Sequence, residues 1–400
     1  MGFRSRQHFL PEQFKSGPRV HTMNKCIYVT ILCLAALLRA EAKNMEVSGF
    51  KVPLPVGNVI GVAFYEDKGM FFVQQSVSTT ENHGLVIRFH RQLSSWSLKS
   101  HSIITKRVFE QAPQGASPFP CGRVETSAKL HRVLICSAEA YLEIIDPDNL
   151  STIGKMAQRD DQDINDFAVD DLRNRLLVLA SRRDGSTRLT AYSLLNGDKQ
   201  QETVLQATYA KRMSLAFDSK TGQIGIAVNA GRRSGDKTDI YTCTADSNLA
   251  CTNVTQVDPV SQISILGRQV LVATSIFADN RNKKDCVLTV DPSGAVSRAY
   301  CSPSTGVHYA VGVVKKSYVV AFTGMSKRIW FSEENKSVTS SFSMWRAGIS
   351  QVDSVAIDPT DYGAFQNELR VVGSNSEPLF IAYQRVSNML YLYSISARFP

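Results

Sequence analysis

A pattern of four short strands separated by turns recurs along this 400-residue chain. In its clearest unit, residues 166–170 alternate polar and apolar side chains, and residues 175–180 form an apolar run typical of a buried strand. A turn and a second alternating segment over 187–193 follow. Asn196-Gly197 is then a hairpin signal, and residues 203–207 complete the unit.

Seven segments of this kind open along the chain, with starts spaced by roughly 45–60 residues. They begin at Val59, Pro120, Asp166, Arg212, Val260, His308 and Asp353. Repeats of about 40–50 residues that hold four strands are typical of β-propeller blades. Tandem β-sandwiches would repeat at about 100 residues, and no segment shows a useful helical period. We therefore predict an all-β chain folded as a β-propeller of seven four-stranded blades, with six blades as the alternative.

The two ends of the repeat region complement each other. The last unit finishes with apolar segments over 378–383 and 389–394 and lacks an outer strand. Residues 45–54 form a spare strand ahead of the first unit, and Pro53 suits an edge position. Pairing the two would hide two sheet edges that otherwise invite aggregation. We expect this N-terminal strand of the mature chain to close the ring, with residues 362–366 in a surface insertion.

Three segments resemble known propeller repeats. They are residues 167–180 (FAVDDLRNRLLVLA), 215–228 (LAFDSKTGQIGIAV) and 145–155 (IDPDNLSTIGK). All are similar to blades of the YVTN/YWTD-type and lactonase-like propellers, in which an A-x-D segment, a turn and an L-Y-V strand recur. The resemblance spans nearly all of residues 45–400 as repeat texture, without a YWTD or YVTN tetrapeptide. It implies the propeller fold and says little about activity, because one fold hosts many functions.

The segment that follows Met23 has the layout of a secretory signal peptide. A lysine precedes an apolar run over 26–38, and an A-x-A cleavage site ends at Ala42. The run is shorter than the roughly 18 residues that a membrane-spanning helix needs, so we expect cleavage and a secreted, extracellular product. This divides the chain into residues 1–22 (a non-native extension or a long leader), 23–42 (the signal peptide) and 43–400 (a single propeller domain).

Cleavage removes two of the eight cysteines, and the other six fall into three pairs that each span one hairpin. The pairs are Cys121 with Cys136, Cys243 with Cys251, and Cys286 with Cys301. Facing residues on antiparallel strands lie about 4.5–5.5 Å apart, within reach of a disulfide. Because exported chains form disulfides, we expect all three bonds, with free buried thiols as the alternative. A zinc site is disfavoured, because no C-x-x-C spacing is present and the histidines are scattered.

Three N-x-S/T sequons follow the predicted leader, at Asn149, Asn253 and Asn335. In a eukaryote each would be a candidate glycosylation site on the surface of a glycoprotein. Such tripeptides also occur by chance, so we expect two of the three to be used. If the chain is bacterial, we do not expect these sites to be glycosylated.

The charge and hydropathy of the chain limit the classes of partner that it is expected to bind. The mature chain has 39 Lys and Arg against 34 Asp and Glu, and the excess is spread along the sequence. A nucleic-acid binder would show a basic stripe, so we expect no nucleic-acid partner. No second apolar stretch is long enough to cross a bilayer. The prediction is a soluble monomer.

Few residues indicate a catalytic or metal-binding site. The sequence has no G-x-S-x-G, H-E-x-x-H or phosphate-loop motif. The densest acidic stretch holds Asp160, Asp161, Asp163 and Asp166, which can offer oxygen ligands to Ca²⁺. Their spacing differs from that of known calcium loops, which favours a solvated loop between blades and no cofactor.

Two functions remain in view. The first is a non-enzymatic propeller that binds a protein or glycan ligand. The second is a lactonase- or esterase-like hydrolase with a metal site in the central channel, which needs convergent polar residues on the innermost strands. Those strand starts offer Asn165, Asp166, His308 and Asp353. They come from units that are not all adjacent, which favours the binding function.

Overall fold

A computed structural model describes the chain from Met45 to Ala397, with gaps. The described residues are 45–53, 57–81, 86–100, 102–109, 121–137, 141–206, 212–229, 237–246, 248–274, 286–301, 307–314, 318–325, 341–346, 352–356, 370–373, 379–386 and 389–397, with side chains described mainly between 60 and 301. The predicted leader, the 362–366 insertion and Asn335 lie outside them. The chain divides into two units, residues 1–45 with 397–400 and residues 46–396. Apart from the end residues Met45 and Ala397, all described strands belong to the second unit.

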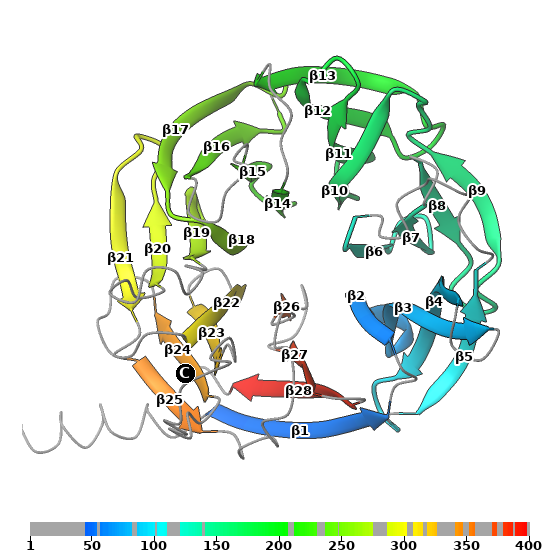
Figure 1. The fold of residues 1–400 in the computed structure, drawn as a ribbon. Coiled ribbons are helices and arrows are strands. Elements are labelled where there is room, and N and C mark those ends of the chain that lie inside the picture. The colour runs from blue at the N-terminus through cyan, green and yellow to red at the C-terminus, as the bar shows by residue number, and fades with distance from the viewer. Residues whose placement is uncertain are drawn as a thin grey trace, which may run out of the picture. The chain divides into compact units, whose positions relative to one another are not determined.

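The described strands form seven four-stranded sheets (Figure 1). The first sheet holds β2 (Gly57–Tyr65), β3 (Met70–Glu81), β4 (Val86–Ser97) and β5 (Ile103–Val108), with a short 3-10 helix, η1 (Glu66–Lys68), after β2. The second holds β6 (Val124–Ser127), β7 (Arg132–Cys136), β8 (Leu142–Ile145) and β9 (Thr152–Met156). The third holds β10 (Gln162–Asp170), β11 (Arg175–Arg182), β12 (Thr187–Ser193) and β13 (Lys199–Gln206).

The remaining sheets follow in chain order. The fourth holds β14 (Arg212–Asp218), β15 (Gln223–Asn229), β16 (Thr238–Thr244) and β17 (Cys251–Val257), and the fifth holds β18 (Val260–Leu266), β19 (Gln269–Thr274), β20 (Cys286–Val290) and β21 (Val296–Cys301). The sixth holds β22 (Val307–Val314), β23 (Tyr318–Met325), β24 (Ser341–Arg346) and β25 (Val352–Ala356). The last contains β26 (Arg370–Gly373), β27 (Leu379–Val386), β28 (Met389–Ala397) and β1 (Met45–Pro53).

The predicted all-β class and four-stranded units are confirmed. In the five sheets from β2 to β21, consecutive strands pair antiparallel throughout, as the blades of a β-propeller do. The four strands expected around residues 166–207 correspond to β10 to β13. Among the described residues, no helix combines the length and hydropathy needed to cross a membrane.

The last sheet combines the two ends of the described chain, in the order β1-β28-β27-β26. In this order the N-terminal strand β1 is the hydrogen-bonded neighbour of the C-terminal strand β28. The predicted start of this unit at Asp353 is wrong, because Asp353 lies on β25 and pairs with Met344 as part of the sixth sheet. The first and the fourth strand of a sheet show the same alternation of polar and apolar residues. Which of the two a segment forms is therefore decided by the strand it pairs with.

The core consists of apolar layers between successive sheets. β11 shows how the sequence builds them, because its apolar run fills both faces of the strand. Leu176 and Val178 pack in the layer shared with the second sheet, whereas Leu177 and Leu179 pack in the layer shared with the fourth. Similar layers join the first sheet to the second and the fourth to the fifth. Each fully buried side chain of this kind contributes about 1.5–3 kcal/mol.

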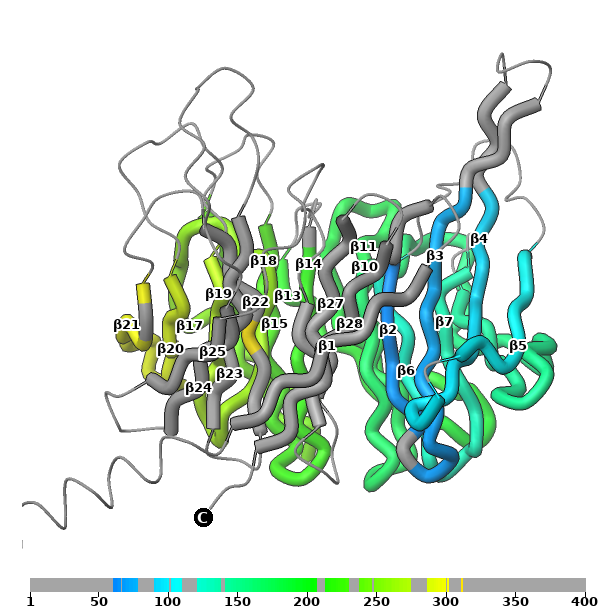
Figure 2. Tube along the Cα trace, turned by 90° about the horizontal axis from the view of Figure 1, so that it is seen from below, coloured from blue at the N-terminus to red at the C-terminus, as the bar shows by residue number. Residues whose placement is uncertain are grey.

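The first strands of successive sheets lie against each other. β2 contacts β6, β6 contacts β10, and β10 contacts β14 (Figures 1 and 2). At Gly61 on β2 the approach is between backbones, since a Cβ there would lie 3.1 Å from the Val124 nitrogen and 3.2 Å from the Gly122 oxygen. Polar side chains on these strands are consequently brought close to those of the neighbouring sheets.

Candidate functional site

Three of the first strands, β2, β10 and β18, carry a β-bulge near their beginning. In β10 the register passes from Ile164 opposite Ala180 to Asp166 opposite Leu179, so Asn165 is an extra residue. Its Oδ1 accepts the backbone N–H of Ser181 at 3.1 Å, which replaces a ladder bond that the bulge removes. Similar bulges occur at Ile60 in β2 and Ser261 in β18. Bulges re-aim the side chains beside them and are common next to functional sites.

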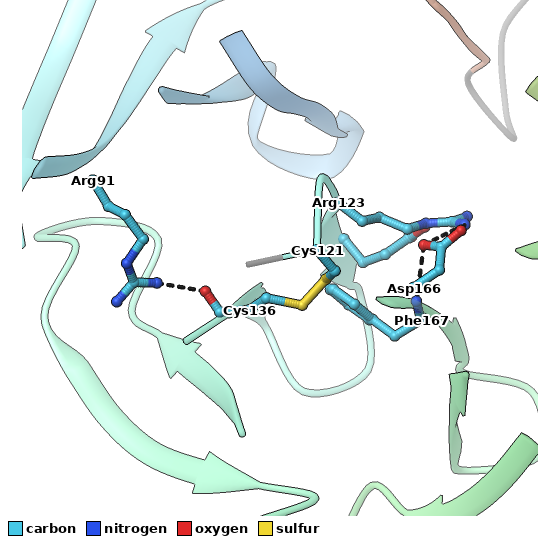
Figure 3. Close-up of a disulfide and its surroundings, with 7 residues drawn as sticks. Arg91, Cys121, Arg123, Cys136, Asp166 and Phe167 are labelled. Atoms are coloured by element: carbon cyan, nitrogen blue, oxygen red, sulfur yellow. Dashed lines mark hydrogen bonds and ion pairs between the residues drawn. A yellow bond between two sulfur atoms is a disulfide. The ribbon is translucent and has the colours of Figure 1, made fainter. Parts of the chain in front are cut away.

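Arg123, immediately before β6, links three successive first strands. Its Nη1 donates to both carboxylate oxygens of Asp166 on β10, at 3.3 and 3.4 Å. The same nitrogen donates to the main-chain oxygen of Leu215 on β14 at 2.6 Å. Its Nε donates to Oε1 of Glu125 on β6 at 2.5 Å. Figure 3 shows the guanidinium directed towards Asp166, and we call Arg123, Glu125 and Asp166 the first-strand cluster.

Asp166 is held from several directions. Its Oδ2 accepts the backbone N–H of Leu215 at 2.7 Å, and its Oδ1 accepts the N–H of Phe167 at 2.9 Å. The carboxylate and Arg123 therefore bind the two main-chain groups of the same residue on β14. Hydrogen bonds to charged groups are about twice as strong as neutral ones. The cluster thus ties the second, third and fourth sheets together at their first strands.

Glu125 is the distinctive ionisable group of the cluster. Burial raises the pKa of its carboxyl, although Arg123 acts in the opposite direction. Burial also acts to lower the pKa of Arg123, but the carboxylates of Glu125 and Asp166 outweigh it and raise that pKa. About 27% of each of the Arg123 and Glu125 side chains remains exposed. Glu125 is therefore recessed among protein groups yet reachable by solvent, and it takes up a proton more readily than a surface glutamate.

The residues proposed for catalysis are only partly brought together. Asn165 and Asp166 are consecutive on β10, where Asp166 pairs with Arg123 and Asn165 bonds to Ser181 on β11. His308 lies on β22, the first strand of the sixth sheet, and its side chain is outside the described ones. Asp353 lies on the fourth strand of that sheet and not on a first strand, which corrects its expected position.

The four calcium candidates do not form one cluster. Asp161 pairs with Arg159 and Arg182, both at 3.0 Å. The hydrogen bond from Arg159 outweighs the effect of burial and lowers the pKa of the Asp161 carboxyl to about 2. Asp166 pairs with Arg123, while Asp160 and Asp163 are exposed. Within the described ranges, no three His, Cys, Asp or Glu side chains are grouped so that they could hold a metal ion.

Sequence reasoning missed Arg123 and Glu125. Their signal is the charged–apolar–charged pattern around Val124, which places both charges on the same side of an extended backbone. It also missed a second link between sheets. Arg91 on β4 donates from Nη2 to Oε1 of Glu143 on β8 at 2.6 Å, and from Nη1 to the main-chain oxygen of Cys136 (Figure 3).

The three disulfides join the cysteine pairs that the hairpin spacing predicts. Cys243 and Cys251 face each other across β16 and β17, and Cys286 and Cys301 face each other across β20 and β21. Cys121 differs, because it precedes β6 and lies two residues out of register with Cys136. Their Cα atoms are 5.7 Å apart, against 4.2 and 4.1 Å in the facing pairs.

The arrangement of the first-strand cluster can do two things. It links neighbouring sheets through charged hydrogen bonds, and it presents one recessed carboxyl, that of Glu125, to solvent.

Searches against models of known protein families and against curated proteins find no match to this chain.

Proposed function

We propose that this chain is a secreted, non-enzymatic β-propeller that binds an extracellular protein or glycan. The proposal includes seven blades, with the last sheet closing the ring through β1. The repeats that resemble YVTN/YWTD-type propellers, the signal-peptide layout and the disulfides that join the described hairpins support it. Oxidising, extracellular compartments are where such bonds persist.

Burial in the first sheet supports ring closure. One face of this sheet packs on the second sheet, through residues such as Phe72 and Leu93. The opposite face, with Phe71, Val73 and Trp96, is buried as well. A sheet face that is buried needs a second layer over it. The last sheet, which includes β1, would supply this layer in a closed ring.

The bonding of Asp166 and Arg123 is the observation that favours binding over catalysis. Both carboxylate oxygens of Asp166 already accept main-chain and guanidinium donors, and Arg123 spans three sheets. Groups held in this way rigidify the scaffold, because several charge-assisted hydrogen bonds fix each side chain. A rigid scaffold that presents loops is the usual basis for recognition.

The raised pKa and recessed position of the Glu125 carboxyl favour the alternative, a lactonase- or esterase-like hydrolase. A recessed carboxyl with a raised pKa is suited to donate a proton to a leaving group. The metal that the sequence-based hypothesis includes has no ligand group among the described residues. In this alternative, Glu125 is therefore the residue to test.

The experiment compares binding and turnover on the purified mature chain. Binding is measured by cross-linking to proteins of the secreting medium and on a glycan array, and turnover with aryl esters and lactones, with and without Ca²⁺ or Zn²⁺. We expect saturable binding to one ligand class and no turnover. Turnover that Glu125→Gln abolishes and Asp148→Asn retains would overturn the binding proposal in favour of the hydrolase, because Asp148 is an exposed carboxylate away from the first strands.

A further inference from the structure

The turn between β8 and β9 is exposed and well ordered by its own hydrogen bonds. Oδ1 of Asp146 accepts the backbone N–H groups of Asp148 at 2.9 Å and Asn149 at 3.3 Å. The main-chain oxygen of Asp146 accepts the N–H of Leu150 at 2.9 Å, and the Leu150 side chain is fully buried. Asn149 and Ser151 on either side of Leu150 are exposed. The turn thus holds a sequon in a fixed, solvent-facing position.

The side chain of Asn149 is bonded through its oxygen only. Oδ1 accepts the backbone N–H of Ser151 at 2.8 Å. Nδ2 makes no hydrogen bond within the part of the chain that the structure describes. This nitrogen is the atom that an N-linked glycan occupies. A sugar attached there would leave the bond from Oδ1 in place and would displace no hydrogen bond to a described residue.

We infer that Asn149 is the principal N-glycosylation site among the described sequons, an inference that rests on the proposed secretion. The co-reactant is an oligosaccharide linked through its anomeric carbon to a polyprenyl pyrophosphate. Nδ2 loses one proton and forms a bond to this carbon. The bond from the carbon to the pyrophosphate oxygen breaks, and the polyprenyl pyrophosphate leaves with the electron pair.

Asn253 is the less suitable acceptor. Its Nδ2 donates to Oδ1 of Asp239 at 3.3 Å, so this nitrogen already has a protein partner. The middle residue of its sequon, Val254, is half-buried, and its main-chain oxygen lies against the hairpin between β20 and β21. A Cβ placed on Gly294 in that hairpin would lie only 2.2 Å from the Val254 oxygen. Access to the backbone on this side of the sequon is therefore restricted.

The test is translation of the full chain in the presence of microsomes from the endoplasmic reticulum. Asn335→Gln is included in every variant, so that this sequon contributes no glycan. We expect one mass increase, removed by peptide-N-glycosidase, that is lost completely in Asn149→Gln and in Ser151→Ala. It should persist in Ser151→Thr, which restores the sequon, and in Asn253→Gln. Asn196→Gln is the matched control, because Asn196 is a turn asparagine outside any sequon.

The results separate this inference from the proposed secretion. A chain that is trimmed and protected from external protease, yet shows no mass increase, overturns the inference and leaves secretion standing. An increase that survives Asn149→Gln and disappears in Asn253→Gln overturns it too. A chain that is neither trimmed nor protected overturns secretion and this inference together.

Discussion

Gly294, in the turn between β20 and β21, touches the neighbouring sheet. Its φ is +88°, and a Cβ at this position would meet the main-chain oxygen of Val254 on β17 at 2.2 Å. Gly294→Ala should therefore lower the free energy of unfolding by about 1–3 kcal/mol, because it combines backbone strain with a collision between sheets. Urea-induced unfolding of the purified chain measures the loss.

Gly267 provides the control for this substitution. It also has a positive φ, +61°, but a Cβ there would find nothing within 4 Å. Gly267→Ala should show only the backbone cost, about 1 kcal/mol. Equal losses in the two variants would contradict a tight contact between the hairpin and β17.

The raised pKa of Glu125 predicts a pH dependence of stability. Above the unfolded value of 4.5 and up to its raised folded pKa, the folded chain binds more protons than the unfolded chain. The contribution of Glu125 is therefore fully present below the unfolded pKa and is lost as the pH rises through the folded pKa. Glu125→Gln should become more stable relative to the natural chain as the pH rises from acid to neutral. Urea unfolding across this range measures the difference.

Glu202 on β13 gives the opposite sign and serves as the comparison. Burial acts to raise its pKa, but Arg188 and Arg182 outweigh this effect and lower the pKa below 4.5. Its contribution is present above the unfolded pKa and is lost as the pH falls through the folded pKa. Glu202→Gln should thus lose stability most at neutral pH. If both variants shift in the same direction with pH, the assignment of Glu125 is wrong.

Among the elements, the β16–β17 hairpin carries a disulfide that joins the largely buried strand β16 to the more exposed outer strand β17. Cys243 packs with Leu179 and Ile226 in the layer between the third and fourth sheets. The sequence separation of 8 residues between Cys243 and Cys251 predicts a loss of about 2–3 kcal/mol for the double variant Cys243→Ala/Cys251→Ala. Alanine is chosen because a buried hydroxyl would add a separate cost. Urea unfolding and far-ultraviolet circular dichroism check that the fold is kept.

The disulfide of the β20–β21 hairpin provides a comparison for this prediction. Its disulfide joins residues separated by 15 positions, so removal of Cys286 and Cys301 should cost slightly more, about 3 kcal/mol. A double variant at either hairpin that cannot be recovered folded would show that the bonds are required for the fold and do not merely reinforce it.

Local pattern predicted individual strands better than their place in a sheet. The alternation and the Asn196-Gly197 turn were sufficient for β10 to β13, because these signals depend on neighbouring residues. The same signals misplaced Asp353, since its strand is assigned by pairing with β24. The link from Arg123 to Leu215 was also beyond prediction, because it joins two residues that are 92 positions apart in sequence.

For the whole molecule, stability is distributed over repeated interfaces. From the first sheet to the fifth, each sheet shares an apolar layer with the next, and charged side chains such as Arg123 and Arg91 join sheets at separate places. No such interface is independent of its neighbours, because a sheet of this kind has two faces to cover. The end sheets are the weak point of such a series unless they cover each other.

The N-terminal strand is where this dependence can be tested. Deleting residues 43–55 removes β1, which leaves β28 as an unpaired edge in the last sheet. Because exposed edges pair with other chains, we expect a lower urea midpoint and aggregation in light scattering. Deleting only residues 43 and 44, which precede β1, should change neither measurement. A peptide of residues 45–53 added to the longer deletion should restore the midpoint, whereas a deletion that unfolds like the full chain would rule out closure through β1.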